Sequence, residues 1–408
     1  MDIRRQALVV FAFCFLTNMV SRGIGESFAV FLLPVAQEFG TDRAMLTGIA
    51  SVYMLATGAM SPLVGIAIDR FGPRWCYSVG LAIFGGVYLL AGFAQALWQL
   101  YLLIGVAAAV GTSLIGLVPA SSLATRWFSG RLPTVMGLLS AALGIGMLVF
   151  APLAQWLIGL MGWRGTYQVL GAVLLLSVLP VALMPWQRLA AGTPEIALAR
   201  RTAAASGVDP WTIRRALRTP VFWALTGVMF FTSLSTVSIS VQLVASLVAA
   251  GFAPMVAATV FGVAGMASIV GMVGAGYFSE RIGEKPFATL SYSASIIGVG
   301  ALALLEVWPS VLLLVLFVLL FGTMQGSRGP LVAVLSVRHF AGARQSAIYG
   351  TVLLGMGVGA ALGAWGSGAL FDLTGGYRAG YLLSAVGAGC GLLLFHTVRG
   401  LSARPVRG

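Results

Sequence analysis

The sequence predicts an all-α polytopic membrane protein with twelve transmembrane helices in two pseudo-symmetric six-helix bundles. Three observations lead to this fold class. Of the 408 residues, 59% are hydrophobic and 9% are charged, and the mean hydropathy is +0.98, whereas soluble domains carry about 25% charged residues. The apolar residues gather in long segments, and the first half of the chain repeats in the second. Lipid is the solvent that accepts such a composition.

Twelve apolar segments are each long enough for the roughly 20 residues of a spanning helix. They run near 7–35, 44–69, 75–95, 97–126, 131–160, 165–186, 221–249, 255–280, 286–305, 309–339, 345–374 and 378–399. The first is too long for a signal peptide, so we expect no cleavable leader. A polar stretch over 187–218 interrupts the pattern, and we expect it to be a cytoplasmic linker between six-helix bundles over 1–186 and 219–408.

The net charge of +13 follows the predicted topology. With the N-terminus in the cytoplasm, 19 of the 24 Lys and Arg residues fall on the cytoplasmic side, 3 on the far side and 2 inside helices. This bias predicts cytoplasmic termini, and we expect a bacterial inner (plasma) membrane location. The basicity therefore needs no nucleic-acid partner. Cys14, Cys76 and Cys390 are interpreted as buried packing residues, and we expect no metal or cofactor.

The internal repeat is carried by three matched blocks. After the second segment stand Gly65, Asp69, Arg70, Gly72 and Arg74, and 211 residues later Gly276, Glu280, Arg281, Gly283 and Lys285. The same displacement relates Gly111, Thr112 and Pro119 to Gly322, Thr323 and Pro330. A displacement of 214 relates Gly162, Trp163, Arg164 and Tyr167 to Gly376, Tyr377, Arg378 and Tyr381. Duplicated halves with substrate held between them are typical of transporters.

The first block and its copy resemble the signature of the major facilitator superfamily, and the resemblance covers the whole chain. A narrower likeness is to the branch of monocarboxylate transporters and oxalate:formate antiporters. It rests on Leu217-Arg218-Thr219-Pro220-Val221-Phe222-Trp223, on Thr125-Arg126-Trp127-Phe128 with Arg131 and Gly137, and on Gly25-Glu26-Ser27-Phe28-Ala29-Val30-Phe31 running to Glu38-Phe39. The resemblance implies the major facilitator fold.

The resemblance also implies a conformational latch at the cytoplasmic face. In the family the first-half acid, here Asp69, meets the positive start of the eleventh helix near Gln345 and Ser346. By pseudo-symmetry Glu280 would meet the start of the fifth helix near Pro133. Arg70, Arg74 and Arg281 would steady the two acids. The alternative is an ordinary solvated cluster of loop charges.

Three charged residues fall inside the predicted helices, where an unpaired charge costs several kcal/mol. Arg22 and Glu26 lie four residues apart on one face, so they either form a structural ion pair or belong to the site. Arg328 has no acidic partner in its own helix, so we expect it to bind an anion through two parallel hydrogen bonds. We expect Glu26 to exchange the coupling proton.

Softer candidates could hydrogen-bond a small ligand or join helices. These are Asn18, Tyr53, Gln242, Gln325 and Tyr349, with the hydroxyl run Ser233, Ser235, Thr236, Ser238 and Ser240. The glycines of the fifth and eleventh helices are interpreted as close-packing surfaces; they are Gly137, Gly144, Gly146, Gly355, Gly357, Gly359 and Gly363.

The charged ligand residues of the resembled branch are missing here. The family's helix-eight Asp and Arg fall at Ser268 and Met272, its helix-eleven lysine at Met356, and its first-helix lysine at Glu26. We therefore expect a substrate other than oxalate, namely a small organic anion, a monocarboxylate with an apolar body.

The expected function is secondary active transport of that anion, by alternating access in a monomer, with protons as the coupling ion. The alternative within transport is proton-driven efflux of drugs or metabolites, which two arginines against one glutamate disfavour. The alternatives outside it are a transporter-like sensor and an integral membrane enzyme. The first lacks a signalling domain and the second a titratable cluster, since His339 and His396 lie in separate helix ends.

Overall fold

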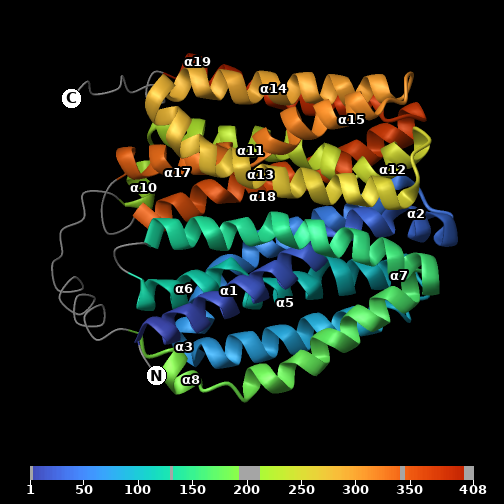
Figure 1. Ribbon diagram of the computed structural model, residues 1–408. Coiled ribbons are helices and arrows are strands. Elements are labelled where there is room, and N and C mark those ends of the chain that lie inside the picture. Colours follow the sequence, from blue (N-terminus) through green and yellow to red (C-terminus); the bar gives the residue numbers. More distant parts are fainter. Residues whose placement is uncertain (1–2, 129–131, 193–211, 341–344, 399–408) are drawn as a thin grey trace. The chain divides into compact units, whose positions relative to one another are not determined.

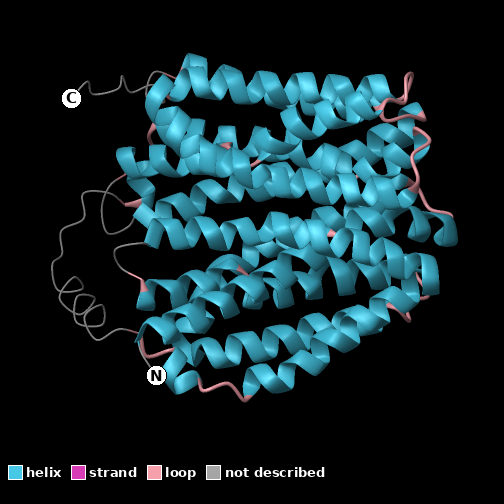
Figure 2. Cartoon of the chain, in the orientation of Figure 1, coloured by secondary structure: helices cyan, strands magenta, loops and turns pink. Residues whose placement is uncertain are grey.

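The computed structural model describes residues 3–128, 132–192, 212–340 and 345–398. Within these ranges nearly every residue is helical and no strand occurs (Figures 1 and 2). The first-half elements are α1 (Ile3–Glu26), α2 (Phe28–Phe39), α3 (Arg43–Ala91), α4 (Leu97–Leu100), the π-helix η1 (Tyr101–Ala107), α5 (Ala108–Ile115), α6 (Leu117–Trp127), α7 (Leu132–Ala182) and α8 (Trp186–Leu189). The all-α membrane fold predicted from composition is confirmed.

The second-half elements follow the same succession. They are α10 (Ile213–Ala216), α11 (Pro220–Ser240), α12 (Leu243–Ala249), α13 (Pro254–Ile282), α14 (Glu284–Leu305), α15 (Val311–Phe317), the π-helix η2 (Val318–Gly322), α16 (Thr323–Gln325), α17 (Arg328–His339), α18 (Gln345–Thr374) and α19 (Arg378–Thr397). Pro220 at the start of α11 has no N–H to satisfy there, and the Thr219 hydroxyl accepts from the Phe222 amide. The helix therefore begins where the sequence places it.

Eleven helices of the described residues are long and apolar enough to cross a membrane. One of them, Leu138–Ala182, has 45 residues, or about 68 Å of helix at 1.5 Å per residue, twice the thickness of a bilayer core. It is broken at Gly162, whose φ of 72° reverses the chain. This long span therefore covers two of the expected segments, near 131–160 and 165–186. Gly72, with a φ of 79°, separates two spans in α3 in the same way.

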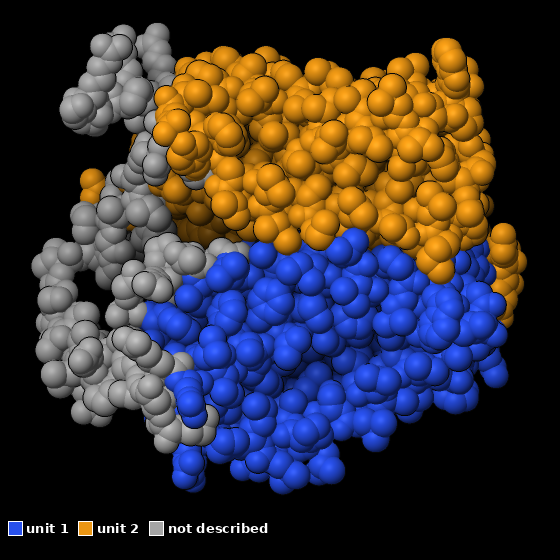
Figure 3. Space-filling view, in the orientation of Figure 1, with its two compact units in different colours: residues 1–34, 56–208 blue, residues 35–55, 209–408 orange. Residues whose placement is uncertain are grey.

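The chain forms two compact units, coloured separately in Figure 3. The first comprises 1–34 and 56–208, and the second comprises 35–55 and 209–408. Helix α3 contributes to both, because its first turns, over 43–55, belong to the second unit. The bundle boundaries at 186 and 219 stay a prediction.

In the first unit, α1 packs closely on α7 and also contacts α5 and α6. A side chain at Gly23 would meet the Gly146 carbonyl at 2.7 Å, so the two glycines let the backbones touch. Hydrogen bonds accompany this approach. The Asn18 amide donates to the Leu139 carbonyl at 2.6 Å, and the Ser21 hydroxyl donates to the Thr112 carbonyl at 3.0 Å.

In the second unit, α11 packs along α18 and α19. Glycines every four residues of α18, namely Gly355, Gly359 and Gly363, face the backbone of α11 at Thr226, Phe230 and Leu234. This spacing keeps one face of α18 free of side chains. The apolar core of the second unit includes Phe222, Leu335 and Phe395.

The two halves repeat one another in structure as well as in sequence. The fourth and tenth membrane segments each contain a π-helix, η1 and η2, followed by a break at Gly116 or Gly326. The helices after the breaks, α6 and α17, begin at Leu117 and Arg328, which are 211 residues apart. The repeat therefore places Arg328 at a helix start inside the membrane segment.

A second structural match supports the repeat. The Arg164 guanidinium donates to the Ala94 carbonyl at 2.6 Å, and the Arg378 guanidinium donates to the Glu306 carboxylate at 3.0 Å. Each arginine stands at the start of a helix and thus fixes the turn before that helix to the loop two segments earlier. The sequence repeat matches Arg164 with Arg378, and in the structure both arginines make a contact of the same kind.

Candidate functional site

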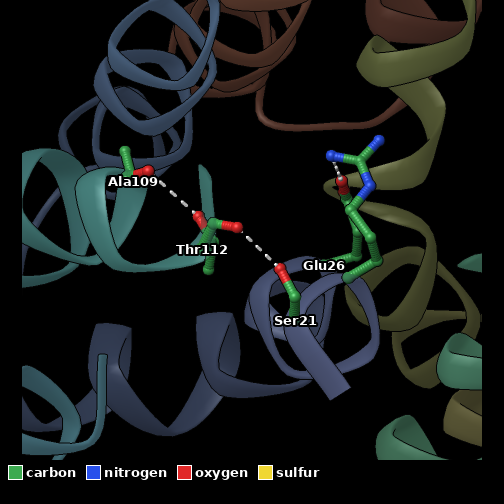
Figure 4. Close-up of polar contacts among 5 residues, drawn as sticks. Ser21, Glu26, Ala109 and Thr112 are labelled. Atoms are coloured by element: carbon green, nitrogen blue, oxygen red, sulfur yellow. Dashed lines mark hydrogen bonds and ion pairs between the residues drawn. The ribbon is translucent and has the colours of Figure 1, made fainter. Parts of the chain in front are cut away.

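Arg22 and Glu26 form an ion pair on α1 in the first unit. The Arg22 Nη1 lies 3.5 Å from the Glu26 Oε1. Figure 4 draws Glu26 with this ion pair as a dashed line, beside the Ser21–Thr112 bond. Their side chains are 31% and 20% exposed. The pairing expected from the four-residue spacing is therefore formed, and each charge is neutralised by its neighbour while both groups remain accessible.

Asn18 lies one turn before this pair and is almost fully buried. Its Nδ2 is used by the bond to Leu139, while its Oδ1 has no hydrogen-bond partner among the described residues. Nearby, Thr112 donates to the Ala109 carbonyl at 3.2 Å within α5 (Figure 4). The polar groups of α1 therefore mainly join helices, and Asn18 retains one open acceptor.

Arg328 is the largest fully buried side chain of the described residues, with 1% exposure. Its Nε donates to the Ser291 hydroxyl at 3.2 Å, and its Nη2 donates to the Ser291 carbonyl at 3.0 Å and to the Ser295 hydroxyl. The guanidinium carbon lies 4.2 Å from the centre of the Tyr292 ring. Helix α14 thus holds the guanidinium along one edge and one face.

The other edge of the guanidinium is open. The Nη1 atom has no hydrogen-bond partner, and no ion pair joins Arg328 to a carboxylate within the described ranges. Burying a charge without a counter-charge costs several kcal/mol. A buried cation with one unpartnered nitrogen needs an acceptor.

The residues that hold Arg328 were not among those predicted from the sequence. Ser291, Tyr292 and Ser295 stand in one helix, and the Tyr292 hydroxyl bonds the Thr232 hydroxyl of α11 at 2.7 Å. The run of polar residues over 291–295 inside an apolar segment was the available signal. Its partner on another helix was not visible in the sequence.

The softer candidates have mixed environments in the second unit. The Gln325 Nε2 donates to the Ala264 carbonyl at 3.0 Å, so that amide joins α16 to α13. Tyr53 is buried, and Tyr349 packs half-buried against the core around Phe222. These three side chains pack within the unit. In the hydroxyl run of α11, Ser235 bonds Ser384 at 3.0 Å and therefore joins helices as well.

Gln242 has an open polar atom in a small cavity of about 10 Å³, enough for one water molecule. The lining includes Ser238, Ser246, Ser367 and Tyr381. The Gln242 Oε1 is buried without a partner in the described part of the chain. The three serine hydroxyls donate to carbonyls of their own helices, so they present acceptors to the cavity.

The predicted site residues are divided between the two units. Asn18, Arg22 and Glu26 belong to the first, whereas Tyr53, Gln242, Gln325, Arg328 and Tyr349 belong to the second. Within the second unit, Arg328 and Gln325 lie three residues apart around the break before α17. Their joint role in one site stays a prediction.

Comparison with known proteins decides the family. The model described as Major Facilitator Superfamily matches residues 11–348. The chain belongs to the major facilitator superfamily. It is 31% identical over 378 residues to monocarboxylate transporter 13 of Rattus norvegicus, covering 91% of this chain and 84% of that protein. It is 25% identical over 398 residues to monocarboxylate transporter 12 of Homo sapiens, covering 92% and 77%. The resemblance to the monocarboxylate branch is confirmed.

Solved structures share the major facilitator fold. A bacterial homologue of the human lysosomal transporter Spinster, in an inward-facing and unoccupied conformation, superposes with a TM-score of 0.74 at 15% identity, covering 98% of this chain and 99% of that one. The nucleoside transporter NupG gives a TM-score of 0.69 at 16% identity, with 95% and 98% covered. At such identities the likeness concerns the fold alone.

The major facilitator signature ends two helices at positive-φ glycines. Asp69 stands three residues before Gly72, and Glu280 three residues before Gly283, whose φ is 91°. The side chains of Asp69 and Glu280, and of Gln345, Ser346 and Pro133, lie outside the described residues. Their contacts stay a prediction.

The arginines of the signature lie at the surface beside aromatic rings. The Arg70 guanidinium lies 5.3 Å from the Phe71 ring centre, and that of Arg281 lies 4.4 Å from the Tyr277 ring centre. Arg74 is exposed. Arginines beside aromatic rings near helix ends are typical of membrane proteins.

Proposed function

We propose that this protein is a monomeric secondary transporter that moves a small organic anion, a monocarboxylate with an apolar body, by alternating access coupled to protons. The observation that carries the proposal is Arg328, a buried guanidinium whose Nη1 has no partner in the described chain. The relatives named monocarboxylate transporters support an anionic substrate. As a member of a transporter family, the chain is inferred to carry solute rather than to catalyse a reaction.

Arg328 is suited to an anion for geometric and electrostatic reasons. The serines of α14 occupy Nε and Nη2, which leaves Nη1 to donate to an arriving oxygen. Such charge-assisted hydrogen bonds are about twice as strong as neutral ones. Because Ser291, Ser295 and Tyr292 are neutral, a bound carboxylate would supply a counter-charge that none of the described residues supplies. Met272 and Met356, at the ligand positions of the family, suit an apolar substrate body.

Glu26 is the proposed proton carrier. It is 20% exposed and pairs with Arg22 at 3.5 Å, so a proton on Glu26 would release Arg22 from this ion pair. An anion on Arg328 and a proton on Glu26 together add no net charge, so the loaded carrier has the same net charge as the empty one. A Glu26→Gln carrier is expected to retain anion exchange and to lose uptake driven by an acidic exterior. Full pH-driven uptake by this variant would contradict the coupling.

The charge distribution supports the proposed orientation. Most Lys and Arg residues flank the segment ends that share a side with both termini, so we place the termini in the cytoplasm. The same orientation suits the proposed location in a bacterial inner (plasma) membrane. Efflux of cationic drugs would instead require acidic groups in the membrane core, and Glu26 there is already paired with Arg22.

The decisive experiment is uptake into proteoliposomes across a panel of labelled monocarboxylates, with and without a pH gradient. Arg328→Lys keeps the charge and loses the planar donor fork, so we expect roughly a tenfold to hundredfold loss of apparent affinity. Arg214→Gln, which removes an exposed arginine of α10, is the control and should transport normally. Wild-type levels of transport by Arg328→Lys and by Arg328→Gln would contradict the anion site.

A further inference from the structure

The start of α3 is capped by an acid from the far end of the chain. The Asp372 carboxylate, near the end of α18, accepts hydrogen bonds from the Arg43 amide at 2.8 Å and the Ala44 amide at 2.6 Å. These amides are the first two of α3, which no carbonyl of their own helix can satisfy. A carboxylate at this position also meets the positive end of the helix dipole.

Further contacts of the same kind align α3 with α18. The Ser51 hydroxyl donates to the Ala361 carbonyl at 2.7 Å, and a side chain at Gly368 would meet the Arg43 carbonyl at 2.8 Å. The Arg43 guanidinium lies 5.2 Å from the Phe371 ring centre. These contacts explain why residues 35–55 belong to the second unit.

The register of this pair is antiparallel. Arg43 lies beside Asp372 and Ser51 beside Ala361. A Cβ atom added at Gly357 would lie 3.9 Å from the Met54 carbonyl oxygen. The contacts of α3 over 43–54 therefore run antiparallel to α18 over 357–372. The family resemblance adds the expectation that Asp69 meets the start of the same helix, near Gln345.

Both acids stand in the same local sequence. Asp69 precedes Gly72 by three residues, and Asp372 precedes Gly375 by three, with φ values of 79° and 69° at the glycines. The glycine ends the helix, so the acid three residues earlier lies in its last turn. There it faces the negative end of its own dipole, which is unfavourable unless a neighbouring helix start supplies amides.

We propose that Asp372 is a far-side latch that opposes Asp69 in the transport cycle. When the far side is closed, Asp372 caps the start of α3, and it releases these amides when that side opens. Asp69 would make the equivalent contact at the other end of the same helix pair when the cytoplasmic side closes. The inference rests on the alternating access of the proposed function and not on its substrate.

The test measures the two ends of the transporter separately, without substrate, by pulsed electron–electron double resonance in nanodiscs. Cys14, Cys76 and Cys390 are first replaced by serine. One spin-label pair replaces the exposed Gln95 and Trp308 on the far side, and a second replaces the exposed Leu183 and Ile282 on the cytoplasmic side. The variants are Asp372→Ala, Asp372→Asn, Asp69→Asn and the double substitution of both acids by Asn.

Loss of the far-side cap should raise the ratio of far-side-open to far-side-closed transporter by about fivefold in Asp372→Ala, the size typical of removing one helix cap. Asp372→Asn, which keeps one acceptor oxygen and the shape of the exposed side chain, should give a smaller shift in the same direction. Asp69→Asn should shift the populations the other way, and the double variant should return towards wild type.

Asp42→Asn is the matched control. Asp42 immediately precedes α3 in sequence, so its charge stays with that helix start in every conformation, and both distance distributions should remain at wild type. Wild-type distances in Asp372→Ala, or a shift in the same direction as Asp69→Asn, would overturn the latch. Because no substrate is present, failure of the anion site at Arg328 leaves this result unaffected, and failure of the latch leaves anion uptake unaffected.

Discussion

At the scale of single residues, the surroundings of Arg328 distinguish the groups that hold its guanidinium from the nitrogen that is left to bind a ligand. Two serines and one tyrosine ring of α14 hold the guanidinium, and the remaining nitrogen is open. A buried ion in this state adds little to folding stability, because desolvation offsets its contacts. Its retention in an apolar unit therefore fits a role in binding.

Replacing Arg328 by methionine tests whether the side chain serves binding or folding. The substitution removes the buried charge while keeping an unbranched apolar stem, so the midpoint of thermal unfolding in detergent should stay equal or rise. Anion uptake should fall to the level of empty liposomes. An unfolding midpoint lowered by many degrees, with uptake lost, would indicate that Arg328 is structural.

Removing one of the supporting hydroxyls should have the opposite effect on stability. Ser295→Ala leaves the Arg328 Nη2 with only the Ser291 carbonyl, and we expect a loss of about 1–3 kcal/mol in the free energy of unfolding. Ser240→Ala is the control, since that hydroxyl bonds only the Thr236 carbonyl of its own helix. Denaturant or thermal unfolding of both variants measures the difference. Equal midpoints would contradict a stabilising role for the Ser295–Arg328 hydrogen bond.

At the scale of elements, close backbone contact between α11 and α18 depends on glycine. A methyl group at Gly359 would lie 2.8 Å from the Phe230 carbonyl carbon, so Gly359→Ala must push the helices apart. We expect a loss of about 1–3 kcal/mol in the free energy of unfolding, typical of overpacking.

Gly350 in the same helix provides the control. A side chain there would meet nothing within 4 Å, so Gly350→Ala should be neutral or stabilise by about 0.5–1 kcal/mol through higher helix propensity. Unfolding midpoints of the two variants should therefore move in different directions. Equal behaviour would mean that the glycine spacing of α18 does not determine its packing.

The elements also show how far the sequence could predict this molecule. Hydropathy located the spans, and the 211-residue repeat placed Arg328 at the position equivalent to Leu117, because both depend on local pattern. The Arg22–Glu26 pair is a contact between neighbouring turns, so its spacing predicted it. The bonds of Asp372 to Arg43 and of Arg328 to Ser291 join residues far apart in sequence, and no local pattern specifies them.

At the scale of the whole molecule, the charge bias makes a topological prediction. Single cysteines at Trp308 and Leu183, in a chain whose own cysteines are replaced, should face opposite sides of the membrane. A membrane-impermeant maleimide applied to intact cells should label the cysteine at position 308 and should label that at position 183 only after the cells are opened. Labelling of both in intact cells would contradict the orientation.

The sharing of α3 between the two units has a consequence for dividing the chain. A cut in the linker over 187–218 leaves residues 35–55 on the first fragment, although their contacts are with Ala361, Gly368 and Asp372 of the second. The second fragment alone would then lack the helix that covers one side of α18. Co-expressed fragments should complement each other, whereas chimaeras that exchange halves with a relative at the linker should need matching residues at both ends of α3 and α18.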